Sequence, residues 1–152
     1  MANLTVTLTE SLTLNSAAMG GTNTVVVSGI NEVNKRIVTV TTTEATILTF
    51  SAAAGQGTYI AANVRYIRFT NLDGTNHVTL TFRNQDNDEA AILLDAGNSF
   101  MLFADNSGGM VGVLNATEDA DANSDVALGS LTNIQADANT GNCDLEMFVA
   151  SV

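Results

Sequence analysis

Apolar and polar residues alternate along several stretches of the chain, which is the pattern of half-buried β-strands. In residues 77–83, valine, leucine and phenylalanine take one side, and histidine, threonine and arginine take the other. Residues 3–14 alternate in the same way, with leucine and valine opposite threonine. We predict a strand there, bent near Glu10, followed by a loop over residues 15–23.

Further strands are predicted over residues 25–28, 33–43, 47–50, 64–70, 77–83, 90–94, 100–104, 110–114, 126–128, 131–135 and 145–152. Several of these are rich in β-branched residues, which favours strand over helix. The turn at Asp73-Gly74 predicts that strands 64–70 and 77–83 form a hairpin. Strands 90–94 and 100–104 are apolar on both faces, so we expect them centrally in a sheet or between sheets. Residues 51–63 are expected to form a loop or a short helical turn.

About ten short strands with regular turn signals predict a sandwich or a barrel. We expect an all-β fold, an antiparallel β-sandwich with a jelly-roll-like order of strands, in a single domain over residues 1–152. The chain has no proline, a residue that commonly blocks exposed strand edges. The edges therefore need another protection, and pairing with a neighbouring subunit is one.

Only 14% of the residues are charged, against about 25% in typical proteins. The surface must consist largely of small neutral residues, which suits packing against other chains. The net charge is −11, and all five basic residues lie in the first 83 positions. This excess of acid excludes nucleic acid and anionic membranes as expected partners, and solubility is its simplest explanation.

No catalytic site is predicted. His77 is the single histidine and Cys143 the single cysteine, and no partner for either is evident in the sequence. We interpret His77 as a solvated turn residue and Cys143 as a small buried apolar residue. The first residues lack the basic and apolar regions of a signal peptide, so synthesis in a cytoplasm is expected.

Oxygen-bearing side chains recur at every second position in an acidic stretch, at Asp119, Asp121, Asn123 and Asp125. Hard cations such as Ca²⁺ take such ligands. The stretch fails as an EF-hand, and a solvated acidic loop is the favoured interpretation. Residues 86–89 form a second acidic cluster. No cofactor is predicted, and Ca²⁺ is left open.

The scarce cations Lys35, Arg36, Arg65 and Arg68 have two interpretations. They pair with acids of the same chain, or they mark an interface where the acidic part of a neighbouring copy docks.

The segments VRYIRFTNLDGTNHVTLTFRN and LLDAGNSFMLF, within residues 64–104, resemble β-sandwich proteins of tailed-bacteriophage virions, of the head-decoration or accessory type. The resemblance implies a non-enzymatic structural subunit of a virion, a capsid decoration (cement) protein. Such a subunit would form a homo-oligomer and bind the major capsid protein or another virion protein. The alternative is a sandwich module that binds Ca²⁺ or a glycan through its acidic loops.

Overall fold

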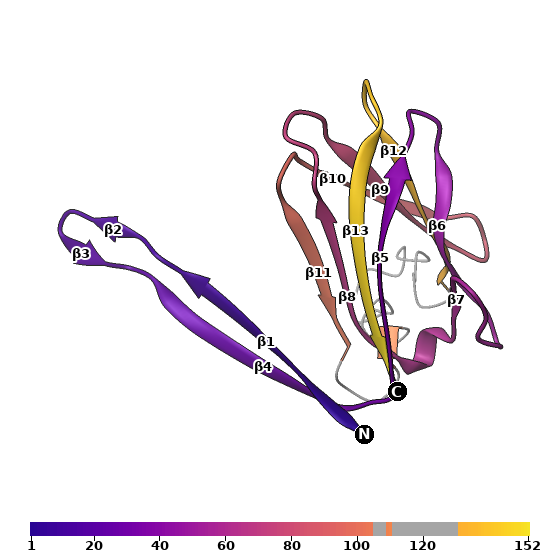
Figure 1. Ribbon diagram of the computed structural model, residues 1–152, viewed down its shortest axis with the longest axis horizontal. Helices are drawn as coiled ribbons and strands as arrows, with labels where there is room; N and C mark the ends of the chain where they lie inside the picture. The colour runs from indigo at the N-terminus through magenta and orange to yellow at the C-terminus, as the bar shows by residue number, and fades with distance from the viewer. Residues whose placement is uncertain (105–108, 111–130) are drawn as a thin grey trace, which may run out of the picture.

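The structure is a computed structural model that describes residues 1–104, 109–110 and 131–152. Two sheets pack face to face, and a long hairpin projects beside them (Figure 1). The strands are β1 (Ala2–Glu10), β2 (Thr13–Leu14), β3 (Ala17–Ala18), β4 (Gly21–Ile30), β5 (Glu32–Val40), β6 (Ala45–Phe50), β7 (Thr58–Tyr59), β8 (Val64–Asn71), β9 (Val78–Asn84), β10 (Glu89–Leu94), β11 (Ser99–Phe103), β12 (Leu131–Ala138) and β13 (Cys143–Ser151). The predicted all-β antiparallel sandwich is confirmed, whereas its jelly-roll order stays a prediction.

The five-stranded sheet has the order β10-β9-β12-β6-β7, and the four-stranded sheet has the order β11-β8-β13-β5. Neighbours are antiparallel except for β6 and β7. Each strand sends alternate side chains between the sheets, where they form the main core. The largest fully buried side chains of this core are Leu48, Ile67, Phe69, Leu80, Met110, Ile134, Leu145 and Met147.

The predicted hairpin between residues 64–70 and 77–83 is wrong, because β8 and β9 belong to different sheets. The six residues from Leu72 to His77 connect β8 to β9 and carry the chain from one sheet to the other. The buried Asn71 side chain donates hydrogen bonds to the carbonyls of Asn76 (2.8 Å) and Leu94 (3.1 Å). Asp73 Oδ1 accepts hydrogen bonds from the backbone N–H groups of Thr75 and Asn76, and these bonds lower the pKa of its carboxyl.

The central placement predicted for residues 90–94 and 100–104 is also wrong. β10 and β11 are edge strands, one in each sheet. An apolar run can form an edge strand because single apolar side chains are often exposed on protein surfaces, and Leu93 is 57% exposed. The four-stranded sheet therefore ends in β11 on one side and β5 on the other.

The segment predicted as a loop over residues 15–23 contains β3 and the first residues of β4. The segment over residues 51–63 holds the short strand β7 and the 3₁₀ turn η1 (Ala61–Asn63), as expected in part. The predicted strands over residues 110–114 and 126–128 lie outside the described residues, apart from the buried Met110. No helix in the described part of the chain is long and apolar enough to cross a membrane.

Candidate interaction surface

The N-terminal hairpin, here called the arm (residues 2–30), is the feature that separates this molecule from a plain sandwich. β1 and β4 pair from Ala2 opposite Ile30 to Glu10 opposite Gly21. β2 and β3 continue the hairpin to its tip, where Leu14 pairs with Ala17. The two residues between them, Asn15 and Ser16, have φ of 51° and 68°, as a two-residue hairpin turn of the primed type requires.

The arm has two chemically different faces because its side chains alternate. Thr7 and Thr9 of β1 lie across from Thr24 and Thr22 on the threonine face, where Thr5 lies across from Val26, and Thr7 Oγ1 lies 3.3 Å from Thr24 Oγ1. The apolar face carries Leu4, Val6 and Leu8 of β1, with Val25 and Val27 opposite. The apolar face needs a cover, because an isolated two-stranded hairpin is at best marginally stable in water.

The base of the arm finds that cover on the four-stranded sheet, on the face turned away from the main core (the outer face). Val27 and Ile30 are buried there against Tyr66 of β8 and Ala150 of β13. Partly buried side chains surround this second cluster: Leu4, Val6, Val25, Met101, Phe103, Phe148 and Val152. The base of the arm is thus held by a small core of its own.

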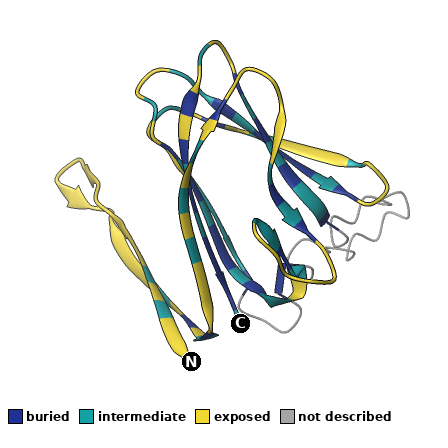
Figure 2. Cartoon of the chain, turned by 45° about the vertical axis from the view of Figure 1, so that its right-hand side comes forward, coloured by how far each residue is buried: buried dark blue, intermediate teal, exposed yellow. Residues whose placement is uncertain are grey.

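The distal part of the arm has no such cover. Leu8, Leu12, Leu14 and Met19 are 49%, 56%, 55% and 63% exposed. Figure 2 shows buried and partly buried segments among exposed ones near the base of the arm, and only exposed residues along its outer length. Where the arm leaves the sheet, an open apolar cleft of about 320 Å³ separates Val6, Leu8 and Val25 from Met101 and Phe103 of β11. The apolar face therefore continues past the surface that covers it.

Three aromatic rings on the outer face support the arm. The Tyr66 ring centroid lies 5.1 Å from that of Phe103 and 5.9 Å from that of Phe148. The Arg68 guanidinium lies over Phe148, 5.8 Å from the ring centroid, in a cation–π contact. Burial raises the pKa of the Tyr66 hydroxyl, against the opposing effect of Arg68.

Beside these rings, the carboxylate of Glu146 on β13 forms ion pairs with both Lys35 of β5 and Arg68 of β8. Lys35 Nζ lies 3.0 Å from Glu146 Oε2, and Arg68 Nη2 contacts Oε1. The hydrogen bond and charge of Lys35, with the charge of Arg68, hold the pKa of the Glu146 carboxyl below its usual range. Two cations share one carboxylate here, and Asp144 is the next outward residue of β13, so positive and negative side chains lie together on this part of the outer face.

Two of the four candidate interface cations, Lys35 and Arg68, thus lie together on the outer face. The other two lie elsewhere. Arg36 points the opposite way from Lys35, and its guanidinium donates to the carbonyl of Ile47. Arg65 Nη1 donates to the carbonyl of Ala62 at 2.6 Å, beside η1. These four cations were candidates from the sequence, which could not show which of them share a face in space.

β5 leaves part of the outer face uncovered at its edge of the sheet. Val33, Lys35 and Ile37 alternate on this face, opposite Ala150, Phe148 and Glu146 of β13. Val33 and Ile37 are 53% and 58% exposed. Two apolar side chains flanking a cation are therefore open to solvent at the edge opposite to β11.

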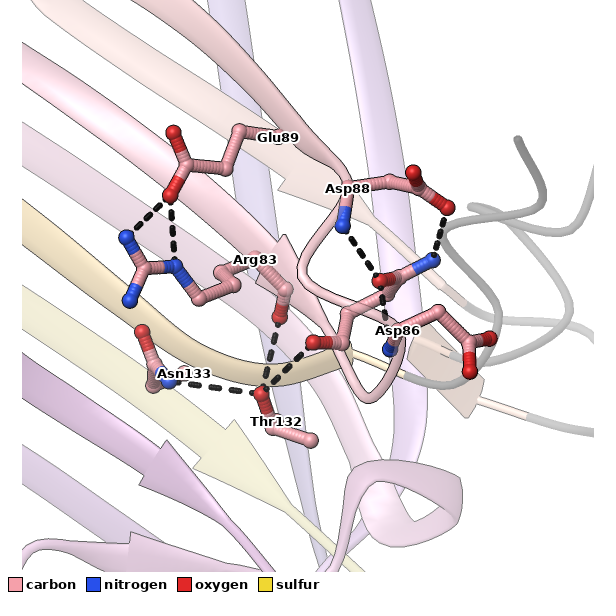
Figure 3. A network of polar contacts seen from close by, with 7 residues as sticks. Arg83, Asp86, Asp88, Glu89, Thr132 and Asn133 are labelled. Atoms are coloured by element: carbon pink, nitrogen blue, oxygen red, sulfur yellow. Dashed lines mark hydrogen bonds and ion pairs between the residues drawn. The ribbon is translucent and has the colours of Figure 1, made fainter.

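The acidic cluster of residues 86–89 is organised by its own chain (Figure 3). Asn84 Oδ1 accepts the backbone N–H groups of Asp86 (2.9 Å) and Asp88 (2.8 Å), and Asn84 Nδ2 donates to Asp88 Oδ2. Arg83 Nε donates to Glu89 Oε1 at 2.6 Å. These contacts give the loop a defined shape without any ligand.

The candidate calcium ligands Asp119, Asp121, Asn123 and Asp125 lie outside the described residues. Within residues 1–104, 109–110 and 131–152, no three acidic, histidine or cysteine side chains gather as a metal site would require. Whether the acidic stretch binds Ca²⁺ stays open, as it was from the sequence.

His77 and Cys143 lie at the same end of the sandwich. His77 is half-buried just before β9, and its carbonyl accepts the backbone N–H of Asn139. Cys143 is fully buried, and its thiol donates weakly to the carbonyl of Gly141. Burial, with Asp73 and Asp144 nearby, raises the pKa of the Cys143 thiol. The thiol form is therefore favoured, in agreement with its interpretation as a packed apolar residue.

No family model, curated protein or solved structure matches the chain. The functional argument consequently rests on the molecule itself. Its most distinctive residues, Leu8, Leu12, Leu14 and Met19, were not predicted as a surface. The sequence does carry a signal for the hairpin. A Thr-x-Thr pattern occurs on both sides of residues 10–21, and these two threonine segments pair in the arm.

Proposed function

We propose that the chain is a non-enzymatic structural protein of a virion, a decoration (cement) subunit that oligomerises and binds the major capsid protein or another virion protein. The observation that carries the proposal is the arm. Four large apolar side chains at its distal end contact nothing that would bury them in the described chain. An exposed apolar stretch of this kind marks a surface for protein association.

The β10 edge of the sandwich supports the same proposal. On the outer face of the five-stranded sheet, Thr79 of β9 lies beside Leu93 of β10, which is 57% exposed. The same face also carries the Arg83–Glu89 ion pair and Asp137 of β12, so a contact here would centre on Leu93 and Ala91, where no charge has to be buried. The arm and this part of the sheet are thus two separate surfaces for association. A cement subunit needs two, one for other copies of itself and one for the capsid shell.

The first test is the mass in solution, measured by size exclusion with light scattering, with and without a calcium chelator. The proposal expects a stable homo-oligomer that the chelator leaves unchanged. A protein that stays monomeric at high concentration contradicts it. A monomer whose melting temperature rises with Ca²⁺ supports the alternative, a Ca²⁺- or glycan-binding module.

The second test addresses the virion directly. Purified particles from the source are analysed by quantitative mass spectrometry for the ratio of this chain to the major capsid protein. A fixed ratio that survives a high-salt wash is expected of a cement subunit. Absence from the particles overturns the virion assignment even if the protein is an oligomer.

A further inference from the structure

We infer that the distal arm of one copy docks on the outer face of β5 in a second copy, with Glu10 of the arm beside Lys35. The inference rests on the oligomeric part of the proposed function and names the two surfaces that meet. On the arm these are Leu8, Glu10 and Leu12, and on β5 they are Val33, Lys35 and Ile37.

The first argument is continuity with an interface that already exists within the chain. The base of the arm lays its apolar face on the outer face of the four-stranded sheet, where Val27 is fully buried. Farther along the arm the same face continues with Leu8, and farther across the sheet the same outer face continues with Val33 and Ile37. Each surface thus extends beyond the contact it makes.

The two extensions cannot meet within one copy. The arm leaves the sheet on the side of β11, where its cleft is lined by Met101 and Phe103. β5 is the opposite edge strand of that sheet, and Figure 1 shows the arm pointing away from it. A second copy is therefore needed to bring an arm over β5.

The second argument is charge. Glu10 is the only charged side chain between residues 2 and 30. Copies with a net charge of −11 repel one another, so an arm with a single charge makes the approach least costly. Lys35 and Arg68 share the carboxylate of Glu146, and Asp144 is the next outward residue of β13 on the same face. The Lys35 side chain is still 58% exposed, so a carboxylate brought by an arm can pair with its open side.

The third argument is spacing. Leu8, Glu10 and Leu12 follow one another at every second position, as do Val33, Lys35 and Ile37. Side chains two residues apart on a strand lie on one face, about 6.6 Å apart. Leu8 and Glu10 of β1 can therefore lie against Ile37 and Lys35 of β5, an apolar–acid pair against an apolar–base pair, while Leu12 lies beyond the end of β1.

A cysteine-mixing experiment tests the contact directly. Purified L8C and I37C single variants are mixed, oxidised, and separated on a non-reducing gel; Cys143 is fully buried and leaves the background low. A disulfide-linked dimer is expected in the mixture in clear excess over that formed by either variant oxidised alone, and such a species can arise only between copies. A mixture of L72C with I37C is the matched control, because Leu72 is similarly exposed (48%) but lies off the arm.

A charge swap tests the pairing. E10K and K35E are each expected to weaken association about tenfold, and the double variant is expected to recover most of it. E44K is the control for a charge change at an exposed acid away from both surfaces. Thermal melting of each variant distinguishes weakened association from loss of the fold.

The outcomes separate the inference from the proposed function. An oligomeric wild type without cross-linking and without recovery in the double variant overturns the docking of the arm on β5, while the proposed function stands. A monomeric wild type overturns both. Cross-linking together with recovery supports both the contact and its register.

Discussion

The sandwich and the arm are built from the same alternating pattern, but they differ in what covers the apolar side. In β9, Val78, Leu80 and Phe82 face a second sheet and are at most 4% exposed. In β1, Leu8 lies in an equally regular pattern and is 49% exposed. The pattern therefore specifies a strand with one apolar face, and the tertiary structure decides whether that face is buried in a core or left exposed.

The largest expected difference between the two regions is in stability. Phe69→Ala empties the centre of the main core and should lower the free energy of unfolding by about 3–5 kcal/mol. Leu14→Ala at the exposed tip of the arm should change it by less than about 0.5 kcal/mol. Urea unfolding at a protein concentration that keeps the copies separate measures both. Equal losses would show that the tip is covered within one copy.

The connection between the sheets should come next in size. Asn71→Leu removes the side-chain bonds to the carbonyls of Asn76 and Leu94 and to the backbone N–H of Asp73. A buried polar group left without a partner costs about 1–3 kcal/mol, so we expect a total loss of about 3 kcal/mol. Chemical unfolding checks the value. A neutral result would mean that the crossing is held by packing alone.

The base of the arm should respond locally. Val27→Ala removes two methyl groups from the second cluster and should cost about 1–2 kcal/mol, mainly by freeing the arm. Hydrogen exchange should become faster at the amides of β1 and β4, while those of β9 and β12 keep their protection. Faster exchange in all four strands would show that the arm and the sandwich unfold as one unit.

The smallest effect concerns pH. Because the pKa of Glu146 is lower in the folded protein than in the unfolded chain, its stabilising effect is complete above the usual carboxyl pKa. The effect is lost as the pH falls through the lowered value. Glu146→Gln should therefore melt at a lower temperature than the wild type at neutral pH, and the difference should shrink towards acid. A constant difference across this range would contradict the role assigned to the ion pairs.

The sequence predicted strands well because the period of two is a local signal. It failed at connections, where the outcome depends on distant strands. The Asp73-Gly74 turn suggested a hairpin, but β8 found better partners in β11 and β13, and β9 in β10 and β12. The run at residues 90–94 suggested a central strand, although alanine and an exposed Leu93 are equally compatible with an edge.

The candidate site shows the same limit. Lys35 and Arg68 lie 33 positions apart in the chain and meet only because β5 and β8 flank β13. Arg36 and Arg65 carry the same charge but point to backbone carbonyls elsewhere. Spacing in the sequence could predict which face each residue takes on its own strand, but not which strands become neighbours.

The joint between arm and sandwich has a mechanical consequence. Asn31 alone separates β4 from β5, and Gly29, two positions earlier, has a φ of 79°. The backbone N–H of Asn31 donates to the carbonyl of Ser151 at 2.9 Å. Nine strand residues span about 30 Å, so a rotation of the arm by about 10° at Asn31 moves the far end of β1 by about 5 Å. The packing of Val27 and Ile30 against Tyr66 and Ala150 sets the angle at which the arm leaves the sandwich. In the docking that we infer, the packing of Val27 and Ile30 would therefore set the position in which the tip of the arm holds a second copy.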